Sequence, residues 1–144
     1  MSKRIPLIAA AALVIAAAIV FTIAAAGRPP AKDFGPGPRT SERGLYVAAL
    51  QDAQTLAPRK MYTLRATVID GATGQAVSNA TIAVDGGMPQ HGHGFPTRPR
   101  VTRNLGNGTY EISGVRFNMG GWWELKLVIT TPAGTDTVTF NLTV

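Results

Sequence analysis

The stretch that decides the fold class is Met61-Tyr62-Thr63-Leu64-Arg65-Ala66-Thr67-Val68-Ile69-Asp70. Apolar and polar residues alternate along it, which places four apolar side chains on one face: Tyr62, Leu64, Ala66 and Val68. An alternation with a period of two is typical of a strand that buries one face and exposes the other. The stretch therefore predicts a half-buried β-strand.

Working outward from this strand, similar short apolar runs recur between turn residues. They cover residues 45–50, 77–84, 98–103, 109–112, 123–130 and 136–144. Asn107-Gly108 directly before Thr109 is a strong hairpin signal, because both residues tolerate the positive φ of a tight turn. No segment after residue 44 shows a helical period of useful length. Short strands broken by Gly, Asn and Pro turns predict an all-β, immunoglobulin-like antiparallel β-sandwich.

The first residues are of a different kind. Lys3 and Arg4 precede an uncharged apolar run, Ile5 to Ala26, which predicts an N-terminal transmembrane or signal helix with its start in the cytoplasm. The run is long enough to cross a bilayer, which favours an uncleaved anchor, whereas Ala24-Ala25-Ala26-Gly27 is an acceptable cleavage site. We expect either a single-pass inner-membrane protein with its domain in the periplasm, or a periplasmic or secreted protein cut after Ala26.

These observations divide the chain into an anchor or signal segment (1–26), a Pro/Gly-rich linker (27–41) and a β-sandwich domain (42–144). The chain has no cysteine, so it can form neither a disulfide nor a lipid-modified cysteine, and a soft metal would have to be bound by Met and His.

Charge argues against a nucleic-acid partner. The formal net charge is +6, but from residue 42 onward nine Lys/Arg face seven Asp/Glu. The cations are spread along the sequence, apart from Arg98, Arg100 and Arg103. A nucleic-acid-binding protein needs a concentrated basic face, so we expect no nucleic acid among the partners.

Catalysis is also not expected. A hydrolytic triad needs a nucleophile beside a base, but there is no cysteine, and no serine lies near the two histidines. The carboxylates are distributed one per strand or turn, so none of them forms an acid–base pair in sequence. We therefore expect a binding protein and not an enzyme.

The candidate site is the stretch Gly86-Gly87-Met88-Pro89-Gln90-His91-Gly92-His93-Gly94-Phe95-Pro96, which its glycines and prolines predict to be an irregular loop. Neutral imidazole suits copper and zinc, the Met thioether selects Cu(I), and a zinc site would be expected to add a carboxylate or thiolate. Met88, His91 and His93 therefore predict a copper site. Two alternatives stay open: the loop hydrogen-bonds its own backbone, or it contacts a peptide or other ligand.

A second stretch, Phe117-Asn118-Met119-Gly120-Gly121-Trp122-Trp123, places a methionine beside aromatic residues. Met119 would supply a second thioether if the loop folds over this strand, although Met beside aromatics also commonly fills a core. Side chains alternate along a strand, so one of Trp122 and Trp123 points inward, and the other is available as a wall of the site.

Three ordered blocks of the chain resemble the bacterial YtkA-like family, which is related to FixH-type proteins. They are Gly-Gly-Met-Pro-Gln-His-Gly-His-Gly-Phe-Pro-Thr, Leu-Gly-Asn-Gly-Thr-Tyr and Arg-Phe-Asn-Met-Gly-Gly-Trp-Trp-Glu-Leu, within residues 60–144. The resemblance implies a membrane-anchored or secreted β-sandwich, with a role in copper handling or in assembly of copper-dependent respiratory oxidases. It implies Met88, His91, His93 and Met119 as candidate ligands. The chain shares only the general anchor-plus-sandwich plan with FixH-type proteins.

Two functional hypotheses follow. In the first, the exported domain binds copper through its Met/His loop and passes the ion to a partner. In the second, the domain docks on a membrane protein complex through the loop and an exposed Trp, without a metal. Imidazoles that converge on one point would favour the first hypothesis.

Overall fold

The computed structural model of the protein describes residues 33–144, and within them it contains nine β-strands and no helix. The expected membrane or signal segment, residues 1–26, lies outside the described residues. Within residues 33–144 no helix has the length and apolar character that crossing a bilayer requires.

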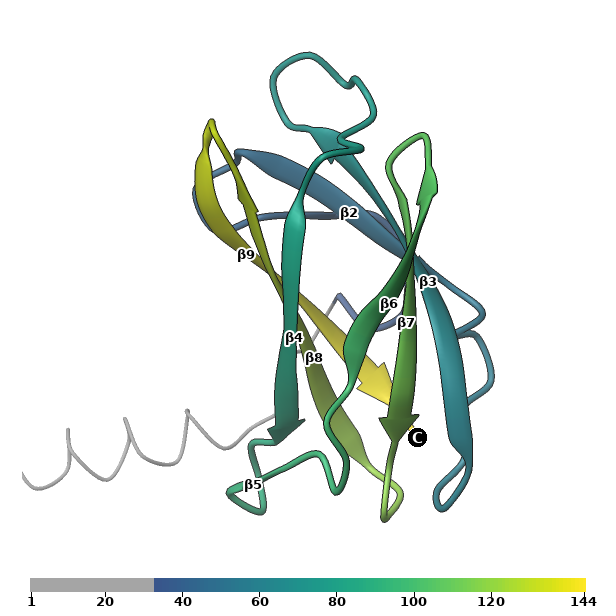
Figure 1. Ribbon diagram of the computed structural model, residues 1–144. Coiled ribbons are helices and arrows are strands. Elements are labelled where there is room, and N and C mark those ends of the chain that lie inside the picture. Colours follow the sequence, from purple (N-terminus) through teal and green to yellow (C-terminus); the bar gives the residue numbers. More distant parts are fainter. Residues whose placement is uncertain (1–32) are drawn as a thin grey trace, which may run out of the picture.

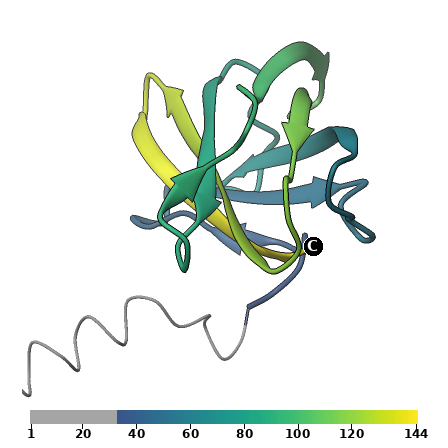
Figure 2. The ribbon, with the colours of Figure 1, turned by 90° about the horizontal axis from the view of Figure 1, so that it is seen from below.

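The strands form two antiparallel sheets that face each other (Figures 1 and 2). One sheet has the order β1 (Arg39–Thr40), β2 (Tyr46–Gln51), β3 (Met61–Asp70), β7 (Thr109–Arg116) and β6 (Arg100–Gly106). The other has the order β5 (His93–Gly94), β4 (Thr81–Met88), β8 (Trp122–Thr131) and β9 (Gly134–Thr143). The prediction of an all-β antiparallel fold is confirmed.

The core lies between the sheets and follows from the alternation in the sequence. In β3 the predicted inward residues Leu64, Ala66 and Val68 are fully buried, and the intervening Thr63 and Arg65 are exposed. The facing sheet contributes the alternate residues of β8 and β9, which are also fully buried: Trp123, Leu125, Leu127, Ile129, Val138 and Phe140. The period of two therefore identifies which face of each strand enters the core.

The predicted hairpin at Asn107-Gly108 is confirmed. The two residues connect β6 to β7 and have φ of 49° and 72°, the left-handed conformation that a two-residue hairpin turn requires. Gly108 also lies close to the backbone of β3, because a Cβ there would be 2.5 Å from the carbonyl oxygen of Val68.

The ordered domain begins earlier than the boundary expected at residue 42. Phe34 forms a bridge with Asn141, the N–H of Gly35 donates to the Asn141 carbonyl, and β1 pairs with β2. Ser41 is buried, and its hydroxyl accepts the N–H of Tyr46. The linker interpretation is therefore wrong for residues 34–41, because backbone hydrogen bonds hold this Pro/Gly-rich segment although it buries few apolar side chains.

Asp136 fixes the end of the domain where β3 ends and β9 begins. It is 4% exposed, and its carboxylate accepts the backbone N–H groups of Arg43, Leu45 and Thr137. Burial acts to raise the pKa of Asp136, but donation from the Ser41 hydroxyl and from these N–H groups outweighs it, so the pKa is lowered. The ionised carboxylate therefore stabilises the folded state.

Candidate functional site

The histidine loop is more regular than its composition suggests. β4 continues through Met88, and the chain returns as β5, with Gly87 opposite Gly94 and Met88 opposite His93. The N–H groups of His91 and Gly92 both donate to the Met88 carbonyl, at 3.1 Å and 3.0 Å, and this closes a tight turn between the strands. The prediction of an irregular loop is thus wrong for residues 86–88 and 93–94.

The glycines permit this pairing because the backbones approach too closely for a side chain. A Cβ on Gly87 would lie 2.2 Å from the carbonyl oxygen of His93, and one on Gly86 would lie 2.1 Å from that of Glu124. Glycine within a strand often marks such a close approach of another backbone. The glycines at 86 and 87 therefore fix β5, and with it His93, against the main sheet.

His93 is half-buried at the edge of the core. Its ring meets the indole of Trp123 edge-on, with 5.6 Å between the ring centres. Its Nδ1 lies 3.1 Å from the carbonyl oxygen of Gly94. When Nδ1–H donates to a backbone carbonyl, Nε2 is the unprotonated nitrogen that can bind a metal, an arrangement common among metal-binding histidines.

His91 lies beside His93 and is exposed. The two ring centres are 6.0 Å apart, and the ring planes are inclined by 34°. Within residues 33–144 no hydrogen bond engages either nitrogen of His91 or Nε2 of His93. The structure therefore brings the two predicted imidazoles together and leaves three ring nitrogens open.

Met88 is the cross-strand neighbour of His93 and belongs to the core. Its side chain is 2% exposed, and a Cβ on Gly121 would lie 3.0 Å from its terminal methyl carbon. Its position opposite His93 on neighbouring strands places both side chains on the same side of the sheet. Met88 thus anchors the start of the histidine turn in the core.

Met119 follows β7 in the segment 117–121 and is 39% exposed, so the core alternative does not describe it. Its carbonyl oxygen accepts the indole N–H of Trp123 at 3.0 Å. Trp123 thus contacts the His93 ring and holds the backbone of Met119 through its indole N–H. These two contacts connect the two stretches that the sequence singled out.

Both tryptophans are buried, and the inward one borders the site. Trp123 is 0% exposed and touches His93, whereas Trp122 is 7% exposed and donates its N–H to the Asn141 side chain. Sequence reasoning missed Phe95 and Phe117, which pack on Trp123 at ring-centre distances of 5.5 Å and 5.2 Å. The positions of Phe95, two residues after His93, and of Phe117, two before Met119, could have indicated them.

A shallow depression of about 250 Å³ adjoins the turn, with a floor of glycine backbone and with Met88, His93 and Glu124 at its sides. Glu124 is engaged with Lys126 at 3.0 Å. Among residues 33–144 no three side chains of His, Cys, Asp or Glu gather as a metal-binding group. Any metal held here by protein side chains would therefore depend on the two imidazoles and on thioether sulfur.

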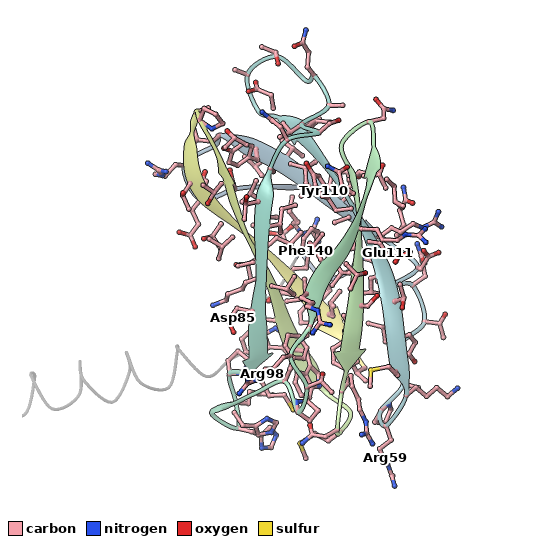
Figure 3. All side chains as sticks on the ribbon, viewed as in Figure 1. Arg59, Asp85, Arg98, Tyr110, Glu111 and Phe140 are labelled. Carbon is pink, nitrogen blue, oxygen red and sulfur yellow. The ribbon has the colours of Figure 1, made fainter. Side chains whose placement is uncertain are left out.

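We use the name site end for the end of the domain formed by residues 89–99, which include β5, by the β2–β3 connection with the first residue of β3 (52–61), and by the last residue of β7 with the β7–β8 connection (116–121). The N–H of Arg59 donates to the carbonyl of Phe117 at 2.6 Å and joins the two connections. Figure 3 shows Arg59 at this end, and Figure 1 shows β5 there.

Comparison with known proteins gave one match. A family model described as YtkA-like matches residues 40–128, which is more than half of the chain and includes the histidine turn, Met119 and both tryptophans. Neither a curated protein nor a solved structure matches the chain.

Proposed function

Because the chain belongs to the YtkA-like family, we propose that it is an exported, membrane-tethered binding module that holds copper at its site end. In this proposal the ion is cargo, and the module passes it to a membrane protein such as a copper-dependent respiratory oxidase. The expected anchor at residues 1–26 keeps the domain at the periplasmic face of the inner membrane.

The observation that supports this proposal best is the distance of 6.0 Å between the ring centres of His91 and His93. Metal–nitrogen bonds are about 2.0 Å long, so two imidazoles on one ion have their ring centres about 5 to 6.5 Å apart. The ring centres of the pair are therefore already at a separation that suits two imidazoles on one ion. The contact of His93 Nδ1 with the Gly94 carbonyl favours Nε2 as the ligand atom.

The neighbouring donors favour copper in its softer state. Met119 is exposed, and its backbone is held by Trp123, which also touches His93, so we propose its thioether as a ligand beside the two imidazoles. Thioether sulfur selects Cu(I), and the carboxylate nearest the depression, Glu124, is paired with Lys126. We assign the buried Met88 to supporting the turn, in contrast to its predicted role as a ligand.

We also infer that the fold is immunoglobulin-like. The order β2-β3-β7-β6 facing β4-β8-β9 matches the arrangement of strands A-B-E-D and C-F-G in immunoglobulin constant-type domains. β5 then corresponds to a short extra strand beside strand C. In this fold the connections between strands cluster at the two ends, where binding loops are usual.

Titration of the purified chain with Cu(I) and Cu(II) tests the metal site. We expect binding with one ion per chain and quenching of tryptophan fluorescence by Cu(II), because Trp123 lies against His93. The variant His91→Ala/His93→Ala should lose at least tenfold in affinity, and Met119→Leu should weaken Cu(I) more than Cu(II). Met61→Leu is the matched control, because Met61 is 61% exposed and starts β3. Unchanged binding in the double histidine variant would refute the copper site.

A second candidate is a metal-independent docking domain on a membrane protein complex. It is favoured by exposed methionines at the site end, Met61 and Met119, because flexible Met side chains are common on protein-binding surfaces. A metal-free chain that co-purifies with a membrane complex and loses it on Met61→Asp/Met119→Asp substitution would support this candidate, and dependence of that contact on copper would oppose it.

A further inference from the structure

The site end carries an uneven distribution of charge. The site end contains Arg59, Lys60, Arg98 and Arg116, and its one acidic residue, Asp52, is paired with Arg65. Three further acids lie close to it: Glu124, which is paired with Lys126, Asp85, which lines a depression together with Arg98, and Asp33, where the described chain begins. These cations are scattered in the sequence, and the fold gathers them at one end.

The cations at this end are exposed and free of ion pairs. Arg59, Lys60 and Arg116 are exposed, and within residues 33–144 no acidic side chain lies within ion-pair distance of any of them. The opposite end carries Glu42, Asp70 and Asp136, of which Asp136 lies 3.9 Å from the Arg43 side chain. The domain is therefore electrically polarised along its strands, with the positive pole at the site end.

Large apolar side chains accompany these cations. Met61 is 61% exposed and pairs with Arg116, and Met119 is 39% exposed three residues further along. Exposed apolar side chains among Lys and Arg are typical of surfaces that rest on anionic membranes, where the cations meet lipid headgroups and the apolar groups enter the interface.

The described chain also starts at this end. Phe34 is 40% exposed and forms its bridge with Asn141 of β9. Asn141 is level with the β5 end of the sheet: it pairs with Glu124 of β8, which pairs with Gly87 of β4, and Gly87 pairs with Gly94 of β5. Figure 2 looks onto this end and shows the start of the described chain near the C-terminus. The expected anchor, Ile5 to Ala26, is separated from Phe34 by only seven residues. A tether this short brings the end from which it emerges close to the bilayer.

We propose that the site end docks on the anionic lipid surface of the membrane in which the chain is anchored. The proposal rests on the tether of the proposed function but not on copper. The anionic headgroups bind Arg59, Lys60 and Arg116, and Met61, Met119 and Phe34 enter the interface. Docking orients the histidine turn toward the bilayer, so the protein that receives the bound ion would be an integral membrane protein.

The test uses the metal-free full chain reconstituted in vesicles, with oxidation of methionine by hydrogen peroxide as the readout. Peroxide crosses bilayers, so the orientation of the chain does not affect its access. Mass spectrometry should show Met61 and Met119 oxidised several-fold more slowly in vesicles with about 30% phosphatidylglycerol than in phosphatidylcholine vesicles, and about 0.5 M salt should remove the difference. Met88 is the internal reference, because its burial in the core does not depend on lipid.

Charge variants decide whether the positive pole causes the protection. Each Lys or Arg near an anionic surface contributes about a fivefold factor, so Arg59→Gln/Lys60→Gln/Arg116→Gln should lower the docked-to-undocked ratio about 100-fold and abolish protection. The control Arg39→Gln/Arg43→Gln/Arg103→Gln removes the same charge from positions outside the site end and should keep the protection.

The outcomes separate this proposal from the proposed function. Equal oxidation of Met61 and Met119 in both lipids overturns docking on lipid and is the result that an acidic protein partner predicts. Protection that persists in the Arg59/Lys60/Arg116 variant also overturns it. A chain that alkaline washing releases from the vesicles overturns the tether and this proposal together. Loss of copper binding in the histidine variants bears only on the copper site.

Discussion

The substitution Gly87→Ala tests whether the close pairing of β4 with β5 positions the histidines. The added Cβ would lie 2.2 Å from the carbonyl oxygen of His93 and 2.8 Å from the Cα of Gly94. Non-bonded carbon and oxygen atoms do not approach within about 3 Å, so β5 must move by roughly 1 Å or separate from β4. The φ of Gly87 is not in the left-handed region, so the clash is the main effect of the substitution.

The expected cost in stability is modest, and the expected loss of function is large. β5 is a two-residue strand at the edge of its sheet, so its displacement should lower the free energy of unfolding by about 1 to 3 kcal/mol, the usual range for overpacking. Its movement carries His93 away from Trp123 and from His91. Losses of about 10- to 100-fold in metal affinity are typical when the groups that orient a ligand are disturbed.

Two measurements check this prediction independently. Urea unfolding gives the stability change, and the proton chemical shifts of the His93 ring report its contact with the Trp123 indole without any metal. Gly92→Ala is the control, because Gly92 has φ of 65° but a Cβ there would meet no atom within 4 Å. We expect this control to cost about 1 kcal/mol and to keep the His93 shifts. Wild-type His93 shifts and copper affinity in Gly87→Ala would refute the reasoning.

Three further predictions concern the rest of the domain and the pH dependence of the site. Asp136→Ala should lower the free energy of unfolding by about 3 kcal/mol at pH 7, because buried N–H groups such as that of Arg43 lose their acceptor. The pKa of Asp136 is lowered in the folded state, so the stabilisation it provides is fully present above its unfolded pKa of about 3.9 and is lost as the pH falls through its folded pKa. Urea unfolding should therefore show the cost of Asp136→Ala shrinking below about pH 4. Tyr110→Phe should cost about 1 to 2 kcal/mol in thermal unfolding, because the hydroxyl donates to the Val77 carbonyl and accepts the N–H of Ala80, and a cost near zero would show that water replaces it. Copper affinity should weaken as pH falls from about 7.5 to about 5.5, because protonated imidazole cannot bind a metal, and a flat titration profile would exclude histidine ligands.

The strands were predictable where one face is buried and the other exposed. Residues 61–70 coincide with β3, because a fixed two-residue alternation leaves one choice of inward face. The histidine turn was not predictable in the same way. Glycine there indicated an irregular loop, but the glycines at 86 and 87 serve close backbone approach within a sheet. Sequence alone does not separate these two uses of glycine.

The candidate site was predictable in its members and not in their exposure. That His91 and His93 lie together follows from their spacing, because one glycine separates them. Which thioether is open to solvent depends on strand pairing: Met88 faces the core as the neighbour of His93, and Met119 is exposed after β7. The gathering of cations at the site end likewise arises only when separate connections meet in three dimensions.

The pairing of Val144 with Gly121 has a consequence for how the protein can be handled. The N–H of Val144 donates to the Gly121 carbonyl and its carbonyl accepts the Gly121 N–H, so Val144 lies beside the connection that leads into Trp122 and Trp123. A polyhistidine purification tag fused there would present additional imidazoles next to the native pair and compete with it for copper. Affinity handles that lack metal-binding groups are needed at this position, or titrations would report the tag.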